Sequence, residues 1–226
     1  MGGKVRKPYL KLRGKPILAW TALALARVPG LEQLVVVTRP EDRRRAQSAV
    51  KLAKLPKRIE VVFADGGARR QDSVRNGLRA TAQDAELVLI HDAARPFPPP
   101  EAIRQALDAA ARLGAAILAM PVRDTLKKET ARHSNSDAPP VSSETVPRAG
   151  LWQAQTPQIF RRALILDLAE RLQKQAPNVE VTDDAAVCER FRQPIALIES
   201  SSTNLKITRP EDVAIAEAFL KLGLVR

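Results

Sequence analysis

The strongest constraint on the fold is the alternation of short apolar runs with longer amphipathic segments. The apolar runs cover residues 34–38, 59–63, 87–91 and 116–121, and polar residues or turns bound each of them. Runs this short and this apolar are typical of strands buried on both faces of a parallel sheet. Segments with helical spacing flank them over residues 17–26, 41–52, 73–81 and 101–113. The order predicts an α/β fold with a doubly wound, mostly parallel sheet, whose ligands bind beyond the carboxyl ends of the strands.

One segment interrupts this alternation. The chain has 226 residues, which suits one α/β domain over 1–226. Residues 127–149 are polar, rich in serine and proline, and have no sustained apolar period. They predict either a mobile loop or a hairpin arm that becomes ordered against a partner. Near the end of the chain, Thr208 and Glu211 predict a capping box, with Pro210 in the first turn of a last helix.

Composition limits the compartment and the partners. Cys188 is the only cysteine, so neither an intrachain disulfide nor a cysteine-based zinc site can form, and a cytoplasmic location is expected. The basic start MGGKVRKPYL lacks the apolar core of a signal peptide, and no apolar run is long enough to span a membrane. The net charge of +12 attracts nucleic acids, acidic membranes and phosphorylated small molecules alike, so charge alone does not choose among them. Because aromatic residues are only 4%, nucleic-acid binding would depend on charge alone, so neither nucleic acid nor membrane is predicted as a partner.

A glycine-containing segment, GGARRQDS, follows the apolar run 59–63 and precedes a helical pattern. Gly66 and Gly67 allow the backbone to approach a ligand closely, and Ser73 together with the start of the helix offers hydrogen-bond donors. The segment is a candidate nucleotide contact. The alternative is a glycine turn in which Ser73 caps the helix.

A second candidate, HDAARP, ends the apolar run 87–91, where an α/β sheet displays its functional side chains. Asp92 is able to ligate magnesium, and Arg95 is able to clamp a phosphate. The alternative is a salt bridge between Asp92 and Arg95 that organises the loop. His91 is predicted to be a hydrogen-bonded structural residue.

Five further residues are weaker candidates. Thr125 and Thr156 lie in segments whose hydroxyls and amides suit the oxygens of a polyol or a phosphate, although each resembles ordinary loop chemistry. Asp183 and Asp184 suit either a metal or the N-terminus of a helix. Lys7 is a cation in a loop-like stretch, where simple solvent exposure is the alternative.

Several of these motifs occur in an order that is more specific than any one of them. GGARRQDSV, HDAARP, PVRDTLK, VPRAGLWQAQTPQIF, TDDA and NLKITRPEDVAIAE closely resemble segments of the 2-C-methyl-D-erythritol 4-phosphate cytidylyltransferase family. The resemblance implies a Rossmann-like nucleotidyltransferase that joins CTP to 2-C-methyl-D-erythritol 4-phosphate, with Mg²⁺, and releases pyrophosphate. Ribitol 5-phosphate cytidylyltransferase is the nearest alternative. A nucleotide-binding protein without catalysis is the alternative outside the enzymes.

The resemblance also assigns roles to residues. It implies that Lys7 and Lys206 are the catalytic lysines on the CTP phosphates, and that Asp92 lies beside magnesium and the nucleotide. The remaining assignments are Gly66, Gly67 and Ser73 for the nucleotide, and Arg95, Thr125, Arg148 and Thr156 for the methylerythritol phosphate. It further implies a homodimer in which the arm at residues 127–149 embraces the second subunit and completes its site. Because the family begins with a strand and a glycine-rich AAGxGxR loop, we expect those elements upstream of Met1, with a shortened paralogue as the alternative.

Overall fold

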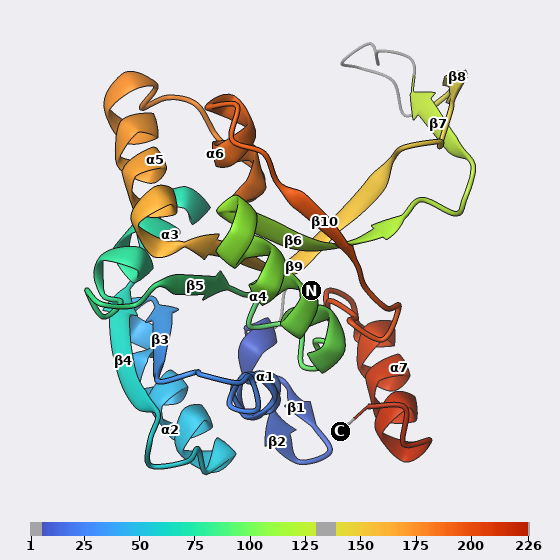
Figure 1. Ribbon diagram of the computed structural model, residues 1–226. Helices are drawn as coiled ribbons and strands as arrows, with labels where there is room; N and C mark the ends of the chain where they lie inside the picture. Colours follow the sequence, from blue (N-terminus) through green and yellow to red (C-terminus); the bar gives the residue numbers. More distant parts are fainter. Residues whose placement is uncertain (1–5, 130–138, 226) are drawn as a thin grey trace.

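The computed structural model describes residues 6–129 and 139–225, which form strands flanked by helices (Figure 1). Its largest sheet has four strands in the order β10 (Ala196–Glu199), β6 (Ala115–Pro121), β9 (Trp152–Arg161) and β5 (Leu87–Ile90). Strand β10 pairs with β6 in parallel, whereas β9 is antiparallel to both β6 and β5. The α/β class predicted from the alternation is therefore confirmed. The alternation did not predict β9 and β10.

Two smaller strand pairs precede this sheet. Strands β3 (Gln33–Thr38) and β4 (Glu60–Asp65) are parallel, and the amide of Gly66 continues their pairing by donating to Thr38 O at 2.9 Å. Strands β1 (Lys11–Leu12) and β2 (Lys15–Pro16) form an antiparallel pair. The carboxyl end of β3 therefore lies next to the glycine segment.

Helices cover both faces of β6 because successive residues of a strand point to opposite faces. Ala116 and Leu118 pack with helix α4 (Pro100–Leu113), and Ile117 packs with Phe160 of β9 and with the later helices α5 (Arg162–Gln175) and α6 (Ala185–Arg190). Gly114 ends α4 at a φ of +94°, as its position in the sequence predicts. The helices and 3-10 turns (η) are η1 (Lys7–Tyr9), α1 (Ile17–Leu25), η2 (Pro40–Asp42), α2 (Arg43–Ala53), α3 (Arg70–Arg79), α4 (Pro100–Leu113), α5 (Arg162–Gln175), α6 (Ala185–Arg190) and α7 (Pro210–Lys221).

The predicted start of one helix and the predicted capping acid of another are wrong, and hydrogen bonds explain both. Helix α3 begins at Arg70 rather than at residue 73, because the Asp72 carboxylate accepts the Arg69 amide at 3.2 Å. For α7 the capping acid is Asp212 and not Glu211, since its Oδ2 accepts the amides of Thr208 and Arg209, both at 2.7 Å. In both helices the third residue supplies a carboxylate that accepts the amide of the residue just before the helix.

The polar segment at residues 127–149 contains a hairpin that projects away from the sheet (Figure 1). Strands β7 (Leu126–Glu129) and β8 (Ser142–Val146) pair antiparallel, and residues 130–138 of the predicted segment lie outside the described residues. The structure thus has the hairpin form of the two alternatives. We call residues 126–146 the arm. Within the described ranges, no helix is long and apolar enough to cross a membrane.

Candidate active site

The centre of the candidate site is the turn that follows β5, which carries Asp92 and Arg95. Asp92 Oδ2 lies 2.9 Å from Lys206 Nζ and 3.3 Å from Arg95 Nε. The Arg95 side chain is 11% exposed and the Lys206 side chain 47% exposed, so the cluster opens toward solvent on the lysine side. Burial opposes ionisation of Asp92, but Lys206 and Arg95 hold its pKa below the usual value. The site therefore offers one carboxylate between two cations.

The backbone of this turn is fixed from several directions. Each carbonyl oxygen from residue 92 to residue 95 accepts a hydrogen bond, and the donors come from the turn itself, from α1 and from the segment before α7. The pairs are Asp92 O with Arg95 N at 3.0 Å, Ala93 O with Thr21 Oγ1 at 2.9 Å, Ala94 O with Ile207 N at 2.9 Å, and Arg95 O with His91 Nε2 at 2.9 Å. Burial lowers the pKa of His91 to about 4, so its ring is neutral near pH 7.

Asn204 joins this turn to β9. Its side chain is fully buried, and Nδ2 donates to Gln155 Oε1 at 2.8 Å and to Thr156 O at 2.9 Å. The backbone carbonyl oxygen of Asn204 accepts a hydrogen bond from Arg95 Nη1 at 2.7 Å. Thr156 Oγ1 in turn accepts the Asp92 amide at 3.0 Å. These contacts hold Asn204, and with it Lys206 two residues later, against the turn after β5.

The glycine segment lies at the carboxyl end of β4. The amide of Gly67 donates to Ser73 Oγ at 2.9 Å, and Ser73 Oγ donates to Arg69 O at 3.1 Å. A Cβ atom on Gly67 would lie 2.3 Å from the Cβ of Asp72, so only glycine fits at this position. Ser73 lies inside the first turn of α3 rather than before it, and its hydroxyl shapes the loop that precedes the helix.

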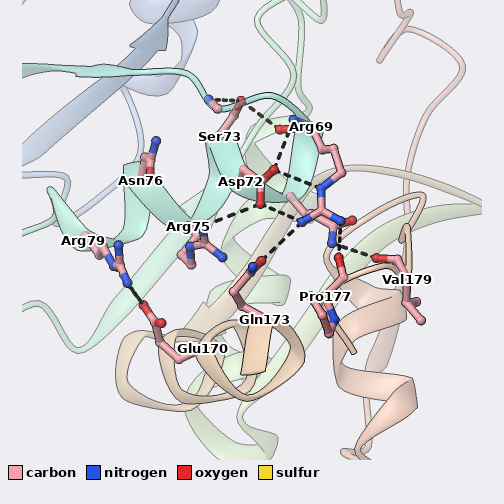
Figure 2. A network of polar contacts seen from close by, with 12 residues as sticks. Arg69, Asp72, Ser73, Arg75, Asn76, Arg79, Glu170, Gln173, Pro177 and Val179 are labelled. Atoms are coloured by element: carbon pink, nitrogen blue, oxygen red, sulfur yellow. Dashed lines mark hydrogen bonds and ion pairs between the residues drawn. The ribbon is translucent and has the colours of Figure 1, made fainter. Parts of the chain in front are cut away.

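Figure 2 shows how the start of α3 is anchored to α5 and to the segment after it. Arg69 contacts Asp72 at 3.0 Å and reaches Gln173 Oε1 at 3.3 Å and the carbonyl oxygen of Pro177. At the other end of α3, Arg79 forms an ion pair with Glu170 at 2.7 Å. Arg69 therefore anchors the end of the glycine segment to α5 and to the residues that follow it.

An ion pair joins the start of α3 to the residue before α6. Arg70 binds both carboxylate oxygens of Asp184, at 3.0 and 2.6 Å, and Asp184 is only 2% exposed. Burial raises the pKa of Asp184 even though Arg70 opposes the shift. Asp183 Oδ1 accepts the Ala186 amide at 2.9 Å, which supports the helix N-terminus alternative for this residue. In the described part of the chain, no three His, Cys, Asp or Glu residues form a group that could hold a metal ion.

Three predicted residues lie apart from the Asp92 cluster in their contacts. Lys7 begins η1 and is exposed, and no ion pair involves it within the described residues. Thr125 and Arg148 are exposed at the base of the arm, where Arg148 Nη1 donates to the carbonyl oxygen of Arg123. The contacts therefore join Asp92, Arg95, Thr156 and Lys206. Thr125 and Arg148, at the base of the arm, form a separate group.

Comparisons with known proteins decide the family. The model of the 2-C-methyl-D-erythritol 4-phosphate cytidylyltransferase family matches residues 1–222. The chain belongs to this family. A 2-C-methyl-D-erythritol 4-phosphate cytidylyltransferase from Desulforamulus reducens is 41% identical over 221 residues, covering 98% of this chain and 90% of that protein.

Longer relatives and solved structures agree with this assignment. The chain is 42% identical over 217 residues to a bifunctional enzyme IspD/IspF of Anaeromyxobacter sp., covering 96% of this chain and 53% of that protein. The solved 4-diphosphocytidyl-2C-methyl-D-erythritol synthase of Anaerococcus prevotii superposes with a TM-score of 0.80 at 29% identity, covering 97% of this chain and 92% of that one. The cytidylyltransferase fold therefore extends over nearly the whole chain.

The sequence motifs did not single out three residues that support the candidate site. Asn204, Arg70 and Gln158 carry no separate motif, and each is a polar residue whose contacts form only in the folded chain. Gln158 is 1% exposed, accepts the Asp184 amide at 3.0 Å and donates to Asp183 Oδ2 at 2.8 Å. Their one signal is their position, because each lies within a few residues of a predicted site residue.

Proposed function

We propose that this chain transfers the cytidylyl group of CTP to 2-C-methyl-D-erythritol 4-phosphate, giving 4-diphosphocytidyl-2-C-methyl-D-erythritol and pyrophosphate. The observation that carries the proposal is the cluster of Lys206, Asp92 and Arg95 at the carboxyl end of β5, in a chain of the cytidylyltransferase family. Two cations around one carboxylate suit a reaction in which two polyanions must approach each other.

The reaction requires charge neutralisation more than proton removal. A phosphate monoester has a second pKa of about 6, so the acceptor phosphate is largely a dianion at neutral pH and needs no strong base. Its oxygen forms a bond to the α-phosphorus of CTP, and the bond from that phosphorus to the bridging oxygen breaks, leaving pyrophosphate with the electron pair. Lys206 stabilises the negative charge on the α-phosphate, and Lys7 contacts the CTP phosphates from the other side.

The residues around Asp92 fit a divalent cation held mainly by the substrate phosphates. Asp92 Oδ2 contacts Lys206 and Arg95, whereas no hydrogen bond to Oδ1 occurs among the described residues. Mg²⁺ in phosphate sites commonly uses one or two carboxylates and keeps several water molecules. We therefore propose Mg²⁺ as the cofactor and Asp92 as its protein ligand. When bound, it neutralises the charge of the triphosphate.

The remaining predicted residues fit two substrate regions. We place the nucleotide against the glycine segment, with Gly66, Gly67 and Ser73 shaping its contact surface beside Asp92. We place the methylerythritol phosphate near Arg95 and Thr156, with Thr125 and Arg148 contributing from the base of the arm. Arg95 keeps guanidinium nitrogens available after its contacts to Asp92 and Asn204, since it has five N–H donors.

The arm supports a homodimer. Most of its described residues are exposed, and an isolated two-stranded hairpin is marginally stable in water. We propose that the arm embraces a second copy of this chain and brings Arg148 to the site of that copy. Mixing inactive Arg148→Ala protein with inactive Lys206→Ala protein should then restore part of the activity in mixed dimers. No recovery after demonstrated subunit exchange would contradict the shared site.

The direct test of the function is magnesium-dependent pyrophosphate release from CTP, with 2-C-methyl-D-erythritol 4-phosphate as acceptor and ribitol 5-phosphate as the control. Release with the first acceptor alone supports the proposal, and release with ribitol 5-phosphate alone replaces the substrate. CTP binding without release supports the nucleotide-binding alternative. We further propose a cytoplasmic location, which suits a single buried cysteine whose pKa burial raises to about 12.

A further inference from the structure

The residue directly before Lys7 is joined by ion pairs to the turn that follows β3. Arg6 Nη1 donates to Asp42 Oδ2, and Arg6 Nη2 lies 3.0 Å from Glu41 Oε1. The Asp42 side chain is only 9% exposed, and among the described residues only Arg6 donates a hydrogen bond to its carboxylate. Because a buried carboxylate is costly without a cation beside it, Asp42 fixes the position of Arg6.

Tyr9, two residues after Lys7, attaches the same stretch of chain a second time. Its ring packs against the core cluster between α1, β3 and α2, and its hydroxyl lies 3.2 Å from Thr38 Oγ1. The Tyr9 amide donates to the carbonyl oxygen of Arg6 at 2.9 Å, which closes a tight turn between the two attachments. The backbone of Lys7 is therefore held from both sides. We call residues 6–10 the lysine segment.

The turn after β3 also holds the glycine segment. The carbonyl oxygen of Thr38 accepts the Gly66 amide at 2.9 Å. A few residues later, Arg43 Nη2 donates to Asp65 Oδ1 at 2.6 Å, and Asp65 is the last residue of β4, directly before Gly66. Residues 38–43 thus connect the lysine segment to the segment proposed above as a nucleotide contact.

We propose that Arg6, Asp42 and Tyr9 are positioning residues, which hold the lysine segment against the elements that carry the glycine segment. Lys7 is thereby placed to reach the CTP phosphates. Arg6 acts through Lys7 rather than on the substrate, because two carboxylates already engage its guanidinium. The role in turnover rests on the function proposed above, whereas the attachment of the lysine segment does not depend on it.

The first test needs no activity. Tyr9 is the only tyrosine of the chain, so full-length protein labelled with 3-fluorotyrosine gives one ¹⁹F NMR signal. Arg6→Ala should shift this signal toward its position in the urea-unfolded chain, because the lysine segment loses one attachment. Arg6→Lys, which keeps a cation near Asp42, should shift it less. Arg45→Ala, an exposed arginine on α2 with no ion pair in the described part of the chain, is the matched control. An unchanged signal in Arg6→Ala would overturn the attachment.

The second test separates positioning from substrate contact. Arg6→Ala and Asp42→Asn should each lower kcat for pyrophosphate release by about ten- to a hundredfold, because both free the same segment and a small displacement of a positioned group is costly. Asp42 is buried, so its variant cannot act by removing a contact with CTP. Arg6→Lys should recover part of the loss. A raised KM for CTP in Arg6→Ala, with normal turnover in Asp42→Asn, would assign the guanidinium to the substrate and overturn the proposal.

A double variant decides whether the effect passes through Lys7. If Arg6 acts only by placing Lys7, Arg6→Ala should lower kcat little further once Lys7→Ala has removed the ammonium group. A general loss of structure would lower kcat by the same factor in both backgrounds, and that result would contradict the proposal. If the unaltered chain releases no pyrophosphate, the proposed function fails, while the fluorine signal still decides whether Arg6 holds the lysine segment.

Discussion

The turn after β5 and the arm differ in what holds them in place. Residues 92–95 have every carbonyl oxygen hydrogen-bonded, and the donors include α1 and the segment before α7. In the arm, side-chain contacts join its own two strands, such as Lys128 with Glu144 at 3.0 Å and Lys127 with Thr145 at 2.6 Å. The turn that carries Asp92 is thus fixed by several elements of the chain, whereas the contacts named for the arm lie between its own strands.

The largest expected effect is the loss of turnover when Lys206 is shortened. Lys206→Ala removes the cation 2.9 Å from Asp92, and we expect kcat to fall by about a hundred- to a thousandfold, as for other groups that stabilise transition-state charge. Lys7→Ala should have a comparable effect if both lysines act on the CTP phosphates. Pyrophosphate release measures both losses.

The fold should survive this change because the Lys206 side chain is half exposed. Lys221→Ala, an exposed lysine on α7, is the matched control and should keep both activity and thermal unfolding temperature. Turnover of Lys206→Ala close to that of Lys221→Ala would remove Lys206 from the mechanism.

The contrast between the two regions also explains what the sequence could predict. Asp92 and Arg95 end an apolar run, and a strand end in an α/β sheet indicates a site regardless of tertiary detail. Glycines and a serine before a helix carry a similar local signal. From its own residues the arm could be predicted only as an interruption, since a polar segment with no period leaves a loop and a hairpin both open, and the family resemblance alone implied an arm.

The supporting residues could not be predicted because their role exists only after folding. Asn204 is polar and fully buried, yet its neighbours in the sequence give no sign that its amide will meet β9. Strand β9 itself escaped prediction, because its early residues are polar and its antiparallel pairing with β5 and β6 breaks the alternating order. The sheet partners decide burial here, and they come from distant parts of the chain.

The second expected effect is a loss of stability at the fixed turn. Asn204→Ala removes the donor from two acceptors, Gln155 Oε1 and Thr156 O, which lie 2.8 and 2.9 Å away. Buried acceptors left without partners cost about 1–3 kcal/mol, so the free energy of unfolding should fall by that amount in a urea titration. Ser202→Ala, an exposed position in the same segment, should change it by less than about 0.5 kcal/mol. Equal effects at the two positions would mean that Asn204 does not fix the turn.

The smallest expected effect lies in the arm. Lys128 and Glu144 are 65% and 56% exposed, and exposed ion pairs contribute about 0.2–1 kcal/mol. Lys128→Ala should therefore leave the free energy of unfolding, measured by urea titration, within about 0.5 kcal/mol of that of the unaltered protein. The measurement is made at low protein concentration, where monomers dominate. A loss above about 1 kcal/mol under those conditions would show that contacts within one chain already fix the arm. A loss that appears only at high concentration would instead place Lys128 in contact with a second copy, because association stabilises the folded arm by mass action.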